Sequence, residues 1–308
     1  LYGPAQTANG WPHPGRLSPL LDFVDKYESY DNPGHDAPIV TTVDGDTEDY
    51  TGFDASKNYL RFDNPTDIFK NKDARLAATV ILPGSIWKDT KIIIQAGVIA
   101  PNGDPHLLVN EGVEVNGTTY WTFGNESNTQ HSGFDPYGGN NTKTGFGFKK
   151  FLNETKPVVA GWNLGNTDFM EFRYAEILLT FAEAVFESGE GDMAAAKTAF
   201  NATRRRAGHT VDIPLTAQNI MREREVEFAF ENKRFWDLVR RREFHTVFDN
   251  TMIHAIMPIQ DLRALPATKY IYVRVNGINQ WYKTFQPRSY YKPIPGIGSN
   301  GLVQNPQY

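Results

Sequence analysis

The chain has 308 residues, of which 40% are hydrophobic and 22% charged, and its formal net charge is −5. This composition is typical of a globular protein with a sizeable core, and the negative charge argues against nucleic acid as a general partner. The absence of cysteine excludes disulfides, thiol catalysis and cysteine-based metal sites. No run of about 18 apolar residues exists, so the sequence predicts no membrane-spanning helix.

The first part of the chain, residues 1–170, is rich in Gly, Asn, Asp, Thr and aromatic residues. We expect a helix over 17–30 and a helical turn or short strand over 73–82. Residues 91–99 include three consecutive isoleucines, which favours a buried strand. Residues 113–123 are predicted to form a hairpin because they contain the favoured Asn-Gly turn. Long polar loops of this kind often carry function.

Residues 173–242 carry a strong helical pattern. A first helix is predicted to end near Gly189, and Asp192 is well placed to cap a second helix. The second helix is rich in alanine and closes at Gly208. Small residues on facing helices allow close approach, so we expect a tight antiparallel pair. The apolar stripe of the first helix consists of Ala175, Leu178, Leu179, Ala182, Val185 and Phe186.

The helix pair spans roughly 35 residues, close to one tetratricopeptide repeat. Thr216 is predicted to cap a third helix that runs to about Arg242. The chain then becomes irregular. A second hairpin is expected from 270–275 and 280–285, which flank another Asn-Gly pair.

Several segments together resemble the SusD/RagB family. The helical region reads RYAEILL, AEA, RRRAG and EREVEFAFENKRFWDL, as in the C-terminal half of that family. The segment FKNKDARLAATVILPG, followed by Trp87, and the ending YYKPIPGIGSNGLVQNPQY also resemble family motifs in the same order. The departures are conservative: Lys72 and Ala74 stand where the family usually has Arg and Pro, and Gln307 replaces the last Gly.

The resemblance implies an outer-membrane, cell-surface lipoprotein with no enzymatic activity. Such proteins bind glycans, as in starch and polysaccharide utilisation, and cap a SusC-like TonB-dependent transporter. The family's lipidated, helical N-terminal half has no counterpart here, so we expect the chain to correspond to the C-terminal portion. Membrane attachment would then come only through a lipid anchor in that missing part.

The predicted fold is mainly α: a TPR-like helical hairpin scaffold, SusD-like, with long irregular loops and a few short β-hairpins. Residues 1–170 are expected to form a loop-rich, ligand-presenting region. Residues 171–308 are expected to form the helical C-terminal region with an irregular tail. Together they would make one compact domain of the SusD/RagB type.

Aromatic residues and amides in polar loops are the candidates for ligand binding. Sugar rings stack their C–H faces on aromatic side chains, and their hydroxyls bond to amides and carboxylates. The alternative is that each aromatic is a half-buried loop anchor. The predicted binding residues are Trp11, Tyr50, Tyr59, Tyr120, Trp121, Asp49 and Asn58. Further candidates in the same loops are Tyr137, Asp44, Asp46, Asn125, Asn128 and Asn140.

Other conspicuous residues are interpreted as structural. Trp87, within the family-like segment, and Trp236, within the third predicted helix, are expected to be structural. Residues that alternate in charge at helical spacing are expected to fix the helices through ion pairs, and the two arginine triplets belong with them rather than with nucleic acid. These residues are Arg173, Glu176, Glu183, Arg222, Glu223, Glu227, Glu231, Arg234 and Asp237, with the triplets Arg204-Arg205-Arg206 and Arg240-Arg241-Arg242.

Signals of catalysis or cofactor binding are weak. Residues 296–301 fit G-x-G-x-x-G, but too few residues follow for the helix that a dinucleotide requires. No cofactor is expected, although Asp44, Asp46 and Asp49 leave a calcium ion as one possibility. Two alternatives to glycan binding stay open: a lid that binds peptide, another nutrient or protein, and a glycoside hydrolase that uses paired carboxylates.

Overall fold

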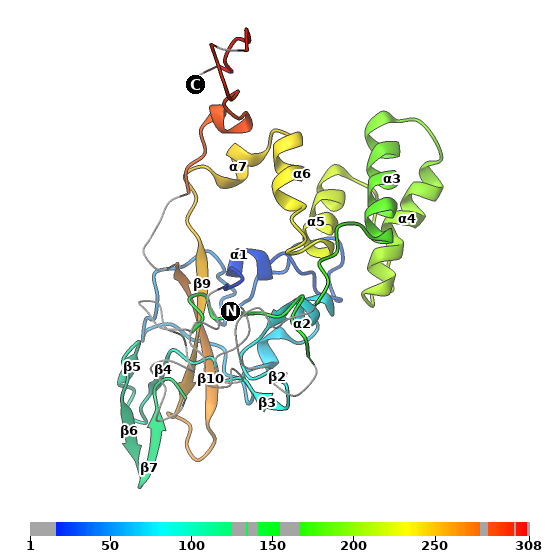
Figure 1. Ribbon diagram of the computed structural model, residues 1–308. Coiled ribbons are helices and arrows are strands. Elements are labelled where there is room, and N and C mark those ends of the chain that lie inside the picture. The colour runs from blue at the N-terminus through cyan, green and yellow to red at the C-terminus, as the bar shows by residue number, and fades with distance from the viewer. Residues whose placement is uncertain are drawn as a thin grey trace.

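The computed structural model has a helical part and a part built on a sheet. Figure 1 shows the larger helices gathered on one side of the molecule and the long strands on the other, with the C-terminal segment extending beyond the helices. The structure describes residues 17–124, 134, 141–154, 167–277, 283–298 and 300–306.

The predicted helix over 17–30 is much shorter in the structure. Only α1 (Leu21–Val24) is helical, and the chain then turns. The carboxylate of Asp25 accepts a hydrogen bond from the backbone of Ile39 at 2.8 Å and one from Arg274 at 2.7 Å. These partners lie far away in the sequence, so tertiary contacts replace the continuing helix.

The segment over 73–82 confirms the expected helical turn and short strand. It forms α2 (Arg75–Thr79), followed directly by β1 (Val80–Ile81). Antiparallel β1 pairs with β8 (Gly147–Phe148). A 3₁₀ turn, η2 (Asp67–Phe69), precedes this unit and buries Phe69.

A four-stranded sheet with the order β10-β9-β4-β5 forms the centre of the second part. β4 and β9 are parallel, and the other two pairs are antiparallel. Ile259 and Ile271, which pair across β9 and β10, are fully buried in the main hydrophobic cluster. The strands are β4 (Gly97–Ile99), β5 (Pro105–Leu107), β9 (His254–Asp261) and β10 (Lys269–Asn276).

Of the two predicted hairpins, the first is confirmed. β6 (Gly112–Val115) and β7 (Thr118–Trp121) meet at Asn116 and Gly117, whose φ angles of 50° and 77° are those of a primed hairpin turn. The second is not formed by the described residues: β10 pairs along its whole length with the preceding strand β9, its Tyr270 and Val275 also bridge to Phe62 and Thr51, and Lys283 bridges to Thr251. Residues 278–282 lie outside the described residues.

The predicted strand over 91–99 is only partly regular. Its first residue ends β3 (Thr90–Lys91), which pairs with β2 (Ile86–Trp87), and its last three form β4. Between them, Ile92 and Ile94 are buried as expected.

The two alanine-rich helices follow the prediction closely. α3 (Tyr174–Ser188) ends at Gly189 with φ 69°, and α4 (Met193–Arg206) begins at Asp192, whose carboxylate accepts from the amide of Ala195 at 2.9 Å. They lie side by side in Figure 1. Leu179, Ala182 and Phe200 fill the contact between them and are fully buried.

The predicted third helix is wrong in one respect: it is broken. Thr216 caps α5 (Ala217–Glu227) as expected, but a separate helix, α6 (Arg234–Arg240), follows after a turn. Within the turn Phe230 has φ 62° and packs its ring edge-on against Phe23 and Phe148, with ring centres 5.5 and 4.9 Å apart. Aromatic packing against distant segments therefore outweighs helix continuation. The remaining elements are α7 (Phe244–Phe248) and the 3₁₀ turn η3 (Pro287–Tyr290).

Buried ion pairs fix the helices to one another and to the first part of the chain. This confirms the structural role predicted for the residues that alternate in charge. Arg75 of α2 donates to Glu223 at 2.6 Å and to Glu227 at 2.9 Å. Arg173 pairs with Glu227 and donates to Glu231 at 2.8 Å. Glu28 likewise pairs with Arg204 and Arg222. We call the whole set of pairs the charged seam.

Arginines of both triplets also form ion pairs, and Arg240 of the second triplet donates to Glu183 at 2.8 Å. Arg205 pairs with Asp212 and Arg206 with Glu227.

Trp87 is 3% exposed, as expected of a structural residue. Trp236 is 59% exposed, which argues against the structural role predicted for it. The break after α5 turns α6 so that this indole faces solvent beside Phe235, with ring centres 5.1 Å apart.

The helical scaffold and irregular loops agree with the predicted fold, but the β-structure is larger than a few short hairpins because β9 and β10 belong to the four-stranded sheet. Within the described part of the chain, none of the helices has the length and hydrophobicity to cross a membrane.

Candidate functional site

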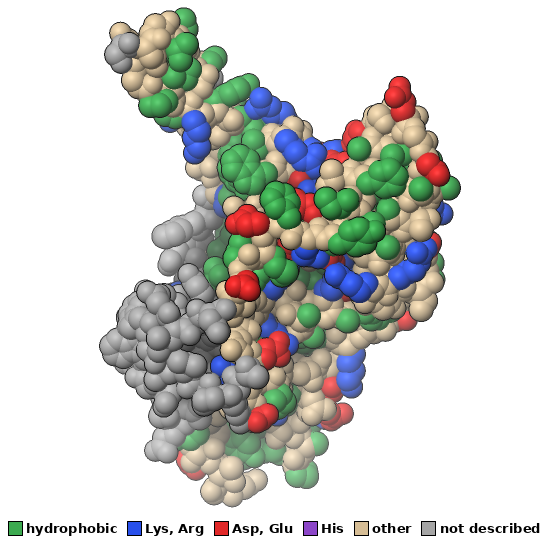
Figure 2. Space-filling view, turned by 45° about the vertical axis from the view of Figure 1, so that its right-hand side comes forward, with side chains coloured by type: hydrophobic (Ala, Val, Ile, Leu, Met, Phe, Trp, Pro, Cys, Tyr) green, Lys and Arg blue, Asp and Glu red, His purple; other side chains and the backbone are tan. Residues whose placement is uncertain are grey.

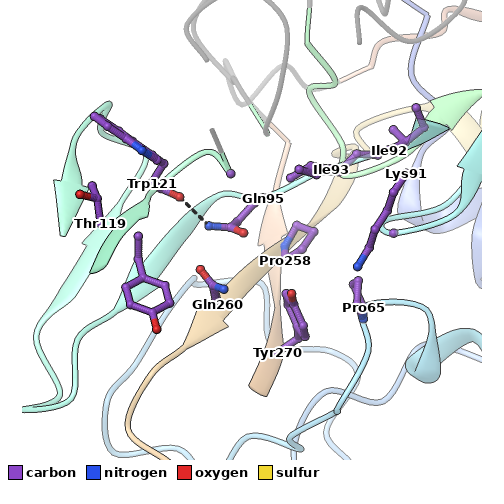
Figure 3. A pocket seen from close by; sticks show the side chains of 14 residues that line it. Pro65, Lys91, Ile92, Ile93, Gln95, Thr119, Trp121, Pro258, Gln260 and Tyr270 are labelled. Carbon is purple, nitrogen blue, oxygen red and sulfur yellow. Dashed lines mark hydrogen bonds between the residues drawn. The ribbon is translucent and has the colours of Figure 1, made fainter. Parts of the chain in front are cut away.

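A cavity of about 230 Å³ lies where the β6–β7 hairpin approaches the central sheet. We call it the hairpin cavity. Its lining comes from β3 and the buried segment after it, from β7, and from β9 and β10 (Figure 3). The lining side chains that matter for chemistry are Lys91, Gln95, Tyr120, Trp121, Pro258, Gln260 and Tyr270.

The pairing of β9 with β10 places polar and aromatic groups together on one wall. Gln260 and Tyr270 lie directly opposite each other in the antiparallel register, so their side chains project to the same face of the sheet. Pro258, two residues before Gln260, shares that face. Burial raises the pKa of the Tyr270 phenol, so its hydroxyl stays protonated and can donate a hydrogen bond.

The opposite wall is held to the hairpin by Gln95. This side chain is 6% exposed, and its amide nitrogen donates to the carbonyls of Trp121 and Thr122, both at 3.0 Å. Two donated bonds fix the position of the amide. They also fix the distance between the hairpin and the segment before β4, and so the width of the cavity.

The two predicted aromatic residues on β7 are brought to this site in different ways. Tyr120 packs in part against a small cluster that contains Val98 and Leu262. The Trp121 indole lies on the far side of its own backbone from Gln95 (Figure 3). Neighbouring strand residues point to opposite faces, so Tyr120 faces the sheet and Trp121 lines the outer edge.

The other predicted aromatic residues interact within the protein. Tyr59 is 7% exposed and belongs to the main hydrophobic cluster, and its hydroxyl accepts from the amide of Asp54 at 3.0 Å. Tyr50 stacks on His254 with ring centres 3.7 Å apart, and its hydroxyl accepts from Arg274 at 2.8 Å. Neither lines the hairpin cavity.

The predicted polar residues also lie elsewhere. Asp49 accepts hydrogen bonds from the backbone and hydroxyl of Thr51 and pairs with Lys57. Asn58 is exposed, and its carbonyl accepts from the amide of Val43 at 2.9 Å. Trp11, Tyr137, Asn125, Asn128 and Asn140 lie outside the described residues.

The acidic loop that includes Asp44 and Asp46 uses its carboxylates for local turns. Asp44 accepts from the amide of Asp46 at 3.4 Å, and Asp46 from that of Glu48 at 2.8 Å. Within the residues that the structure describes, no three His, Cys, Asp or Glu side chains form a group suited to a metal ion. The geometry of the loop therefore adds nothing to the calcium hypothesis.

Sequence reasoning missed three residues of the hairpin cavity: Gln95 from the segment before β4, and Gln260 and Tyr270 from the central sheet. Gln95 was detectable as the one polar residue within the apolar run 92–96, since a buried amide needs partners. The other two come together only through the pairing of β9 with β10, which the sequence did not predict.

The described lining of the hairpin cavity consists mainly of uncharged polar groups and of aromatic or apolar faces. Among the described residues around the cavity, Lys91 is the charged one, and Asp, Glu and His are absent. Amides, a phenol and aromatic or proline faces can bond to hydroxyls and cover C–H surfaces.

Comparison with known proteins identifies the family of the chain. Residues 5–308 match the profile of the SusD family. The chain belongs to the SusD family. No curated protein matches it.

Solved structures support the fold of this SusD family member. A SusD-like protein from Bacteroides fragilis is 21% identical with a TM-score of 0.55, over 95% of this chain and 47% of that one. A SusD-like carbohydrate binding protein from the same organism is 20% identical with a TM-score of 0.51, over 90% of this chain and 46% of that one. The chain thus spans about half the length of the solved structures it matches.

Proposed function

We propose that this chain binds an oligosaccharide or polysaccharide in the hairpin cavity and leaves it chemically unchanged. The observation that carries the proposal is the lining itself, where Tyr120, Tyr270 and two glutamine amides face one space. Membership of the SusD family supports it, as does the structural likeness to a SusD-like carbohydrate binding protein from Bacteroides fragilis.

The mechanism is retention. A sugar ring lies against the Tyr120 face, while Gln260 and the Tyr270 hydroxyl bond to its hydroxyl groups. Affinity is modest, micromolar to millimolar, because sugar hydroxyls give up good contacts with water on binding. The absence of a carboxylate in the described lining supports a non-catalytic role, since glycoside hydrolysis uses two carboxyl groups.

The cellular role follows from the family. We infer that the protein acts at the outer-membrane surface as part of a lipoprotein and delivers the glycan to a SusC-like TonB-dependent transporter. Family membership is the support for this inference. Transfer requires that the glycan dissociate readily, which agrees with modest affinity.

The test is affinity electrophoresis of the chain in native gels that contain a panel of polysaccharides, each paired with an assay for released reducing sugar. We expect one or more polymers to retard the protein without sugar release. Gln260→Ala should reduce the retardation, whereas Gln286→Ala, the same change at an exposed position outside the cavity, should not. No retardation by any polymer contradicts glycan binding by this chain, and sugar release contradicts a non-catalytic role.

A second candidate function, a contact with protein, is favoured by an exposed apolar face. Tyr174, Ile177 and Phe181 recur along one side of α3 and are 73%, 61% and 41% exposed. Phe172 and Trp236 are also largely exposed, and Figure 2 shows hydrophobic side chains among charged ones on the helical part. Exposed apolar side chains that share one side of a helix often mark interaction sites.

We therefore propose that this face also contacts the transporter. Capture of the transporter from membrane extracts by the wild-type chain, but not by Ile177→Lys with Phe181→Lys, is the expected result. Equal capture by both proteins would exclude this face from the contact.

A further inference from the structure

The described lining of the hairpin cavity contains a free cation, Lys91 at the end of β3. Its ammonium group forms no hydrogen bond or ion pair with any residue that the structure describes. Figure 3 shows the side chain reaching from β3 towards Pro65, with its nitrogen on the side of the cavity where Pro258 and Tyr270 lie. A free lysine on open surface is ordinary, so the surroundings of this one decide whether it has a role.

The surroundings of Lys91 supply other hydrogen-bond donors. The Tyr270 hydroxyl stays protonated because burial raises its pKa, and the amide nitrogen of Gln260 carries two N–H groups. Both side chains belong to the wall formed by β9 and β10. The ammonium group itself has three N–H donors and no acceptor. Three donor side chains therefore line one cavity, which favours an acceptor that is negatively charged.

The carboxylate that follows Gln260 on β9 is turned away from the cavity. Asp261 is its neighbour in the strand, and neighbouring strand residues point to opposite faces of a sheet. Asp261 is fully buried and bonds to Arg61 at 2.9 Å and to Arg263 at 2.8 Å. Its charge is matched by these two arginines rather than by Lys91.

Carboxylates on either side of the lining proline also have partners of their own. Asp63 pairs with Lys269, and Asp67 pairs with Lys70 at 2.9 Å. Asp89, in the turn between β2 and β3, has an interaction of its own and lies outside the described lining. The lysine is therefore the charge that the described lining presents to a ligand, although the whole chain carries −5. Its effect on a ligand is local and does not come from the net charge.

We propose, on the basis of the function proposed above, that the hairpin cavity prefers a glycan whose sugar rings carry an acidic group, and that Lys91 binds this group. A sugar ring lies against Tyr120, and an acidic substituent on that ring or the next accepts hydrogen bonds from Lys91 and Tyr270. A lysine acts as a point charge without the paired donors of arginine, so it fits a carboxylate and a sulfate alike.

The test is calorimetric titration of the full chain with pairs of polysaccharides that differ in charge. The pairs are polygalacturonate and its methyl ester, hyaluronan and its carboxyl-reduced form, and dextran sulfate and dextran. We expect the acidic member of at least one pair to bind about fivefold or more tightly than its neutral counterpart, and the difference to shrink as salt is added. The first two pairs report on a carboxylate and the third on a sulfate.

Variants of Lys91 separate a specific contact from general attraction of a polyanion. Lys91→Met keeps the apolar stem and should weaken binding of the acidic polymer by about threefold to fivefold. Lys91→Arg keeps the charge and should stay within about twofold of the wild type. Lys197→Met removes one charge from an exposed position on α4, outside the cavity, and should leave the affinity unchanged.

The results distinguish this proposal from the proposed function. If a neutral polysaccharide binds and no acidic polymer binds more tightly than its neutral counterpart, the preference for acidic glycans is overturned and glycan binding stands. Equal affinities of Lys91→Met and Lys197→Met for the acidic polymer would overturn the role of Lys91. Failure of every polymer to bind would overturn both proposals.

Discussion

Arg204 and Glu28 form a buried two-bond ion pair across 176 residues of sequence. Nη1 and Nη2 of the arginine donate to the two carboxylate oxygens at 2.6 and 2.7 Å, and both side chains are at most 5% exposed. The same carboxylate serves Arg222. The pair fixes α4 against the turn that follows α1.

Removal of this pair should destabilise the protein. Arg204→Met leaves Glu28 buried with one partner fewer, and loss of one member of a buried pair costs about 3 to 5 kcal/mol. The free energy of unfolding from urea titration measures the effect. The neighbouring Arg205→Met is the matched control: Arg205 is 46% exposed in its pair with Asp212, so its change should stay within about 0.5 kcal/mol. Equal losses in the two variants would contradict a special role for the buried pair.

Acid should weaken the charged seam. Burial by itself would raise the pKa of Glu227, but Arg75 and Arg173 outweigh burial and lower it to about 2. Because the folded pKa lies below the ordinary value of 4.5, the stabilisation is complete above that value and is lost as the pH falls from about 4.5 towards about 2. The free energy of unfolding measured across this range should fall, and Glu227→Gln should flatten the fall. An unchanged slope in Glu227→Gln would show that this carboxylate does not contribute.

The aromatic face of the hairpin cavity should carry part of the glycan affinity. Tyr120→Ala removes a stacking contact of about 0.5 to 1.5 kcal/mol, so we expect a loss of up to about tenfold for the polysaccharide that retards the protein most. Tyr120→Phe keeps the ring and should retain most of the affinity. Trp236→Ala, at an exposed indole on α6, is the control and should change nothing. Calorimetry of the four proteins is the measurement.

Tyr59 should matter for stability rather than for binding. Its side chain lies in the main hydrophobic cluster, and Tyr59→Ala should cost about 3 to 5 kcal/mol through the cavity that it leaves. Tyr59→Phe loses only the bond to the amide of Asp54 and should cost about 1 kcal/mol. Glycan affinity of Tyr59→Phe should equal that of the wild type, and a clear drop would place Tyr59 in the binding site after all.

The sequence predicted those elements whose ends are set by residues within one turn of the chain. Gly189 and Asp192 mark the end of α3 and the start of α4 because a left-handed residue and a side-chain cap act within one turn of the chain. The Asn116-Gly117 turn predicted the β6–β7 hairpin for the same reason. Family motifs identified the fold.

Elements decided by distant contacts escaped prediction. The sequence from Thr216 onward has a helical pattern, yet the chain leaves the helix where Phe230 meets Phe23 and Phe148. The pairing of Tyr270 with Gln260 depends on which strand β10 joins, and the sequence predicted a partner strand after β10 rather than β9 before it. The hairpin cavity consists largely of such pairings, so only Tyr120 and Trp121, on the local hairpin, were named in advance.

The charged seam also limits how the sequence can change. Arg75 from the first part of the chain meets Glu223 and Glu227 of α5, and each member is nearly buried. A reversal of charge at residue 75 is tolerable only with a compensating reversal on α5, some 150 residues later. The loop-rich part and the helical part therefore cannot diverge independently, and grafting the loops of one relative onto the helices of another requires that both sides of the seam be exchanged together.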